Sequence, residues 1–374
     1  MPSTRTQSLS LLSAAALVLA GALPAVAQDV PDDLTVMPAV SNDYQPARTP
    51  WGDPDFRGTW PINDIAELPV ERPDRFGMRH WKTDEELAAE QGRVEALEQA
   101  YESEDHQGTI GLGHWIEYQA GSRRTSMIVE PANGKLPRLT RQGIHDAAEM
   151  RSSWVVGQTF DWVDDFDSWD RCWTRGFPAS MLPFRYNNGI RIFQAPGYVV
   201  IVLEMLGTRI IPVGNTAQWP AGVSGMFGQS RGRWEDHNTL VVETTNLQPG
   251  ASALNIATRG VPPNNTLPMS RQARTVERFH MIGPDTITYE LTYADPVMFE
   301  APFTLRMDWT RDDAYEFFEY ACHEGNVQIR NYITADRAAR EAEYARGRMV
   351  EPIDPDAGPP PAMDPASRGV GNRN

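Results

Sequence analysis

The chain lacks the short motifs that mark several common enzyme classes. It has no G-x-S-x-G nucleophile elbow, no H-E-x-x-H zinc motif, no phosphate-binding loop and no dinucleotide fingerprint. Hydrolases and dehydrogenases of those kinds are therefore disfavoured. Basic residues are also few, with 34 Lys and Arg against 50 Asp and Glu and a net charge of -16. Because nucleic acids and anionic membranes attract basic surfaces, we expect neither as a partner.

Long apolar runs are missing after the first twenty residues. Residues 9–20 are almost wholly apolar, Arg5 precedes them, and Ala25-Val26-Ala27 forms a small-x-small cleavage signal. This pattern predicts a signal peptide over 1–27, cut after Ala27, and a periplasmic or secreted protein; an uncleaved anchor is the alternative. No later stretch has the length of a membrane span. In an exported chain with two cysteines, Cys172 and Cys322 favour one disulfide over a metal cluster.

Short alternating β-type segments separated by turns dominate the chain from Arg191 onward. Such a run predicts a mainly β fold in which an antiparallel meander closes into a lipocalin-like β-barrel, since closure hides the strand edges. The expected strands cover 192–194, 198–205, 209–213, 232–235, 239–245, 275–281, 286–293, 303–309 and 315–322.

The remaining segments are expected to surround this barrel. Thr83-Asp-Glu-Glu86 is a capping box that opens a surface helix over 84–104. A strand near 123–130 and a short helix over 140–150 follow. We expect a charged helix over about 334–349 and then a disordered tail rich in Pro and Gly. The predicted organisation is a signal peptide over 1–27, an N-terminal arm with its helix over 28–150, a barrel domain over 151–333, and the C-terminal helix and tail over 334–374.

Polar and aromatic residues gather near both cysteines. If the cysteines pair, one end of the β structure gathers Arg171, Arg175, Tyr186, His323 and Glu324. A tyrosine beside an arginine or a cation can have a lowered pKa and act as a base, although turn chemistry also explains Tyr186-Asn-Asn-Gly189. His323 and Glu324 form the best acid–base pair in the sequence. On a strand, however, only one of them would face inward.

Charged residues in apolar surroundings are a second signal. Glu204 ends the apolar run 199–205 and Arg209 follows across the next turn, so we expect a buried pair. It is either structural or able to orient a substrate or hold a metal. Five aspartates lie between Asp161 and Asp170. They form either a solvated acidic loop or a calcium site, but the glycine and terminal glutamate of an EF-hand loop are missing.

Several long motifs give the chain a family likeness. They are TPWGDPDFRGTW, RCWTRG, MLPFRYNNGIRIFQAPGYVVIVLEM, SRGRWEDHNTLVVETTNL and YACHEGN. Through them residues 50–326 resemble a large family of exported bacterial β-rich proteins. The motifs are specific to the family and not to a reaction. This group is similar to the glutathione-independent β-etherases, which cleave β-O-4 aryl ethers of lignin.

That resemblance implies a β-barrel enzyme that uses calcium as a Lewis acid, an ionised tyrosine as a base and no organic cofactor. The substrate would be a small aromatic or lignin-derived ether, and an arginine would stabilise the departing phenolate. Each aromatic residue could equally belong to the core. The expected site residues are Tyr186, His323, Arg175 and Arg209 for catalysis, Trp173, Phe184, Phe193 and Arg185 for the substrate, and Asn188, Glu204, Glu324, Asp165 and Asp167 for the metal.

Two other functions stay open on the sequence alone. One is a lipocalin-like binding protein that holds a hydrophobic small molecule without converting it. The other is a carbohydrate-active lyase or hydrolase with two carboxylates facing each other. The acidic charge and the tryptophans are also compatible with a homo-oligomer.

Overall fold

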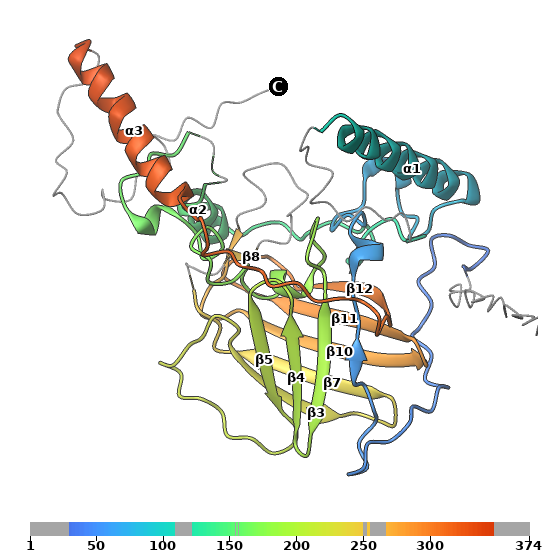
Figure 1. The fold of residues 1–374 in the computed structure, drawn as a ribbon. Coiled ribbons are helices and arrows are strands. Elements are labelled where there is room, and N and C mark those ends of the chain that lie inside the picture. The colour runs from blue at the N-terminus through green and yellow to red at the C-terminus, as the bar shows by residue number, and fades with distance from the viewer. Residues whose placement is uncertain are drawn as a thin grey trace, which may run out of the picture.

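Two large antiparallel sheets, one short two-stranded pair and three α-helices make up the computed structural model, which describes residues 30–108, 122–153, 155, 157–249, 253–254 and 267–347. The expected mainly β class is confirmed over these residues (Figure 1). The signal peptide expected over 1–27 and the tail expected over 350–374 lie outside them.

A four-stranded sheet forms one side of the core, in the order β1-β3-β4-β5. Its last three strands form the two consecutive hairpins that the alternating pattern predicts, and short turns join them. The first strand comes from the N-terminal segment and pairs Gly58 with Ile192. The strands are β1 (Gly58–Thr59), β3 (Ile190–Ala195), β4 (Tyr198–Leu203) and β5 (Gly207–Pro212).

A six-stranded sheet forms the other side, in the order β2-β12-β11-β10-β7-β6. One face of each long strand is buried, as the alternation of buried and partly exposed residues along β10 shows. The strands are β2 (Ile128–Glu130), β6 (Gln229–Trp234), β7 (Thr239–Thr245), β10 (Arg274–Gly283), β11 (Thr286–Ala294) and β12 (Phe303–Thr310); β8 (Ala253–Leu254) and β9 (Leu267–Pro268) form a separate pair.

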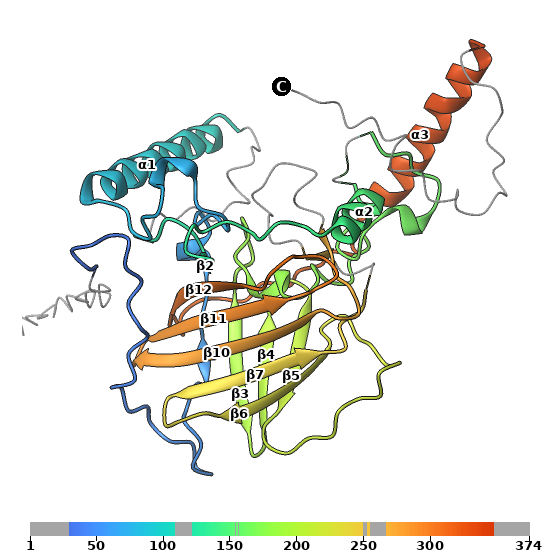
Figure 2. The ribbon, with the colours of Figure 1, turned by 180° about the vertical axis from the view of Figure 1, so that it is seen from behind.

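The two sheets pack face to face with their strands at a steep angle, which both ribbon views show (Figures 1 and 2). They join at one corner, where Val213 forms a parallel bridge with Gly232 and the Gly214 N–H donates to the Gly232 carbonyl at 2.9 Å. Between the sheets lie large buried side chains such as Trp309 and Tyr289, whose rings stack at 4.6 Å. Burial of this apolar surface is the main force that holds the sheets together.

The described strands do not close into the lipocalin-like barrel expected from the meander. Residues 315–322, expected as its last strand, form no strand ladder. The N–H of Phe318 donates to the carboxylate of Glu204 at 2.9 Å, so a side chain takes the place of a neighbouring strand. The observed architecture is therefore a pair of packed sheets joined at one corner.

The helices lie beyond one end of the sheets. The capping box is confirmed, because the Thr83 hydroxyl accepts from the Glu86 N–H at 3.2 Å and the Glu86 carboxylate accepts from the Thr83 N–H at 2.9 Å. The C-terminal helix starts six residues earlier than expected and extends away from the sheets (Figures 1 and 2). The helices are α1 (Asp84–His106), α2 (Arg141–Glu149) and α3 (Gln328–Ala345).

Candidate functional site

The disulfide expected between Cys172 and Cys322 is confirmed, with 5.6 Å between the two Cα atoms. It joins the end of the acidic loop to the turn that precedes α3. The side chain of Asn326 reinforces the link by donating to the Asp170 carbonyl at 3.1 Å. As a result, Tyr320 lies next to Tyr186, although the two are far apart in the sequence.

An aromatic cluster fills the space beside this disulfide. Trp169 and Phe184 are buried with their ring centroids 4.9 Å apart, and Phe184 contacts the edge of Tyr186 at 4.8 Å. Tyr186 and Tyr320 then lie almost parallel, with 6.4 Å between their centroids. Both tyrosines are partly exposed, so they form the outer side of the cluster. Sequence reasoning missed Trp169 and Tyr320, whose positions within three residues of a cysteine are the signal that could have found them.

Arg175 lies against the inner side of this cluster and is only 3% exposed. Its guanidinium carbon is 4.9 Å from the Phe184 ring centroid and 5.6 Å from that of Trp169. The Nη1 atom donates to the Leu182 carbonyl at 3.0 Å, whereas Nε and Nη2 have no partner among the described residues. Burial lowers the pKa of Arg175 to about 10, and only Tyr186 and Tyr320 oppose this shift. The guanidinium is thus a buried cation that the described carboxylates do not neutralise.

Tyr186 is a neutral phenol at pH 7 in this environment. Burial raises its pKa above the ordinary value, and the charge and hydrogen bond of Tyr320 raise it further, whereas Arg175 acts in the opposite direction. The expected lowering of this pKa by a neighbouring cation is therefore outweighed by loss of hydration. Tyr186 can donate a proton here more readily than it can act as a tyrosinate base.

Glu204 holds the Tyr-Asn-Asn-Gly loop in place. Its Oε1 atom accepts from the Asn187 amide at 3.1 Å and the Phe318 N–H at 2.9 Å. Its Oε2 atom accepts from the Gly189 N–H at 2.9 Å and the Tyr315 hydroxyl at 2.8 Å. One carboxylate at the end of β4 thereby connects the loop that carries Tyr186 to the segment that leads to Tyr320. Its role in this structure is to position both tyrosines.

The prediction that Glu204 pairs with Arg209 is wrong. Arg209 is buried between the sheets and contacts Glu277 of β10 through two hydrogen bonds, at 2.6 and 2.8 Å. The Tyr289 hydroxyl donates to the same carboxylate at 2.7 Å, and the Phe177 ring lies 4.3 Å from the guanidinium carbon. Because Arg209 points inward from β5, its partner is on the opposite sheet and not across the turn.

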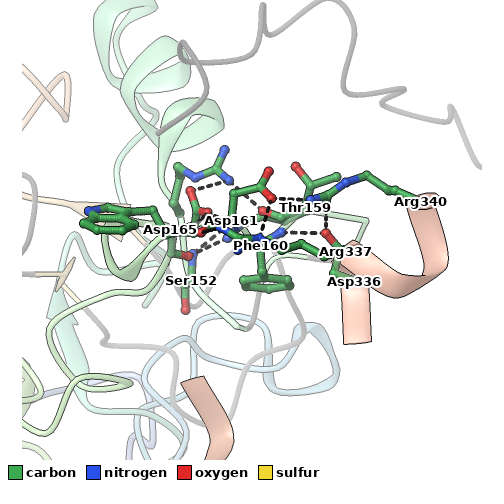
Figure 3. Close-up of polar contacts among 11 residues, drawn as sticks. Ser152, Thr159, Phe160, Asp161, Asp165, Asp336, Arg337 and Arg340 are labelled. Atoms are coloured by element: carbon green, nitrogen blue, oxygen red, sulfur yellow. Dashed lines mark hydrogen bonds and ion pairs between the residues drawn. The ribbon is translucent and has the colours of Figure 1, made fainter. Parts of the chain in front are cut away.

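The acidic loop is neutralised by arginines and backbone N–H groups. Asp165 is buried and pairs with Arg151 at 2.6 Å, while Asp161 pairs with Arg337 and Arg340 of α3 (Figure 3). Asp167 is also buried, and its oxygens accept from the Ser152 hydroxyl and from two backbone N–H groups. The loop therefore serves as a docking point for the middle of α3.

The donor set found here does not fit a calcium site. Among the described residues no three His, Cys, Asp or Glu side chains gather into a possible metal-binding group. Asn188 closes the loop on itself, since its Oδ1 accepts from the Phe184 N–H at 2.7 Å and its Nδ2 donates to the Phe184 carbonyl at 2.9 Å. Glu204 already accepts four hydrogen bonds. Calcium needs six to eight oxygens, which these residues do not supply, and calcium dependence stays a prediction.

The other expected residues lie in different places. His323 and Glu324 are exposed in a turn and not on a strand. Trp173 is 57% exposed and lies against Arg171, and Phe193 is 49% exposed on the outer face of β3. The structure thus brings together Arg175, Phe184 and Tyr186, with Asn188 and Glu204 behind them. Arg185 is exposed. The expected residues that belong to other parts of the molecule are Arg209, Phe193, Asp165 and Asp167.

Comparisons with protein-family models, with curated proteins and with solved structures find no match to this chain. Among the described residues, none of the helices combines the length and the apolar character that crossing a membrane requires. The disulfide is compatible with an oxidising compartment such as the periplasm or the extracellular space.

Proposed function

We propose that this protein is an exported enzyme that cleaves β-O-4 aryl ethers of lignin-type aromatics without glutathione. Its site is the cluster of Arg175, Tyr186 and Tyr320 with the rings of Phe184 and Trp169, which we call the Arg–Tyr site. The observation that carries the proposal is a buried, unneutralised guanidinium beside two tyrosine hydroxyls. The choice of substrate rests on the resemblance of the chain to the glutathione-independent β-etherases.

The chemistry uses groups already in place. Tyr186 donates its proton to the ether oxygen as the bond between that oxygen and the β carbon breaks, and the product leaves as a phenol. The neighbouring hydroxyl oxygen of the substrate forms the new bond to the β carbon, which gives an epoxide. Its proton passes through Tyr320, whose ring lies beside that of Tyr186, and restores the Tyr186 phenol. Atoms and electrons balance without an oxidant or a reductant.

Release of phenol from a model arylglycerol β-aryl ether tests the proposal. The mature chain, residues 28–374, is assayed without glutathione, with calcium in one set of tubes and a chelator in another. We expect Tyr186→Phe to lower kcat by about 10²-fold or more, since it removes a positioned proton donor. Tyr198→Phe, which changes an exposed tyrosine of β4, is the matched control. No release by the unaltered chain in either set would refute the proposal, and release that the chelator stops would restore a role for calcium.

A second candidate is a binding protein for an aromatic small molecule. The observation in its favour is the raised pKa of Tyr186, which leaves the described part of the site without an ionised base. In that case Tyr186→Phe would change the affinity for an aromatic ligand, and no phenol would be released.

A further inference from the structure

The free donors of Arg175 form one complete edge of its guanidinium group. The Nη1 atom is bound to the Leu182 carbonyl, and the rings of Phe184 and Trp169 lie against the group. The two atoms without a partner among the described residues are Nε and Nη2. These two nitrogens lie side by side, and their N–H bonds point in the same direction. Such an edge matches the two oxygens of a carboxylate in a bidentate contact.

We propose that Arg175 is the receptor for a carboxylate on the ligand, so that the ligand of the Arg–Tyr site is an aromatic acid. This inference deepens the proposed function and rests on it for the site, because it adds a charged group to the aryl ether. The edge with Nε and Nη2 binds the carboxylate. The aromatic ring of the ligand lies among Phe184, Tyr186 and Tyr320.

The electrostatics of the site favour a singly charged anion. A guanidinium that is 3% exposed and lacks a described carboxylate partner is costly to bury, and a ligand carboxylate would supply the missing charge. The net charge of the chain is -16, which repels multiply charged anions such as phosphate. The side chains around Arg175 are aromatic, so an acid with a ring buries more apolar surface than a small aliphatic acid does.

Binding is measured by calorimetry at pH 7 on the mature chain, with no ether present. The probes are benzoate, its neutral isostere benzamide, acetate and inorganic phosphate. We expect benzoate to bind about tenfold more tightly than each of the other three, since only benzoate combines the ring with a single carboxylate. Equal affinities for benzoate and benzamide would overturn the proposal, as would the absence of saturable benzoate binding. Tight binding of acetate or phosphate would overturn the aromatic part of it.

Three variants locate the contact. Arg175→Lys keeps the positive charge but loses the two parallel N–H donors of the guanidinium edge. We expect it to weaken benzoate binding about tenfold while benzamide binding stays unchanged. Arg175→Met removes the buried charge, and we expect loss of benzoate binding without loss of thermal stability. Arg171→Met changes a nearby arginine that lies over the exposed ring of Trp173, and it is the matched control. Unchanged benzoate affinity in a folded Arg175→Lys variant would refute the assignment. Since no turnover is measured, failure of the etherase proposal does not affect this result.

Discussion

Gly189 is the residue on which the contacts of Glu204 depend. A Cβ atom there would lie 2.8 Å from the Glu204 Oε2 atom and 2.8 Å from ring atoms of Tyr315 and Phe317. We expect Gly189→Ala to displace residues 315–318 and to lower the free energy of unfolding by about 1–3 kcal/mol. Denaturant titration measures the change. Gly222→Ala, at a glycine with open space around it, should leave the stability nearly unchanged; equal effects of the two substitutions would contradict this account.

Arg209 and Glu277 form a fully buried ion pair between the two sheets. Removing one partner leaves the other charge buried, so we expect Arg209→Met alone to lower the free energy of unfolding by about 3–5 kcal/mol. The double variant Arg209→Met, Glu277→Leu should recover most of that loss, because no unpaired charge remains. Urea titration of the single and double variants checks the difference. A double variant as unstable as the single one would show that the pair is not the cause.

Only the local part of the site could be predicted from the sequence. Arg175, Phe184 and Tyr186 lie within twelve positions of one another, near a cysteine, and the structure brings them together. The partner of Arg209 could not be predicted, since Glu277 lies 68 residues away on the other sheet. Burial raises the pKa of Tyr186, and Tyr320, which reaches the site through the disulfide, raises it further. Side-chain environments of this kind follow from long-range packing and not from local patterns.

Hairpins and capped helices were the predictable elements. The strands from β3 to β5, and the pair β10 and β11, follow one another through short turns, so alternation and turn residues identify them. The pairing of β7 with β10, and of β1 and β2 with distant strands, has no local signal. Residues 315–322 alternate like a strand but contact the Glu204 side chain instead of a neighbouring strand. The alternation of apolar and polar residues in the sequence does not show whether a sheet edge is available for the segment to pair with.

The helix α3 is attached to the rest of the protein mainly through its middle part, residues 332–340. None of its residues is buried, and Tyr332 contacts Phe160 with 4.9 Å between the ring centroids. Asp336 accepts from the Phe160 N–H at 2.9 Å, and Arg337 and Arg340 form ion pairs with Asp161 (Figure 3). We therefore expect Asp161→Asn to increase amide hydrogen exchange throughout α3. Added salt should act in the same direction in the unaltered protein, since it screens exposed charges.

Mass spectrometry of exchanged peptides provides the measurement for this helix. Glu341→Gln, at an exposed glutamate of α3, is the control and should leave exchange unchanged. Equal protection of α3 in the Asp161 variant and the unaltered chain would mean that the ion pairs do not hold the helix.

The stability of the whole molecule should depend on pH through Asp167. Burial, and then repulsion by Asp170, raises the pKa of Asp167 to about 6. Between about pH 4 and pH 6 the unfolded chain therefore loses this proton first, and its contribution to stability falls as the pH rises through that window. Asn at this position does not titrate. We expect the stability of the unaltered chain relative to Asp167→Asn to fall by about 1–3 kcal/mol from pH 4 to pH 6.

The comparison with Asp167→Asn is needed because other groups act in the opposite direction. Burial and nearby arginines lower the pKa of His80 to about 4, so its contribution is lost as the pH falls from 6.5 to 4. For Glu290, burial acts to raise the pKa, but His280 and Arg306 outweigh it and lower the value to about 2. Its contribution is lost below about pH 4. Thermal unfolding of the unaltered chain and of Asp167→Asn across this pH range checks the difference. If the stability of the two proteins changed equally with pH, the assignment to Asp167 would be contradicted.

The buried charge of Arg175 also has a consequence for evolution. A methionine or leucine at this position would fill a similar space without the loss of hydration that a buried guanidinium suffers, so selection for folding alone favours its replacement. Retention of arginine over many generations thus requires a benefit that outweighs the lost stability. Descendants of this chain that do not need the proposed carboxylate ligand should be recognisable by an apolar residue here, while the cysteines that maintain the fold persist.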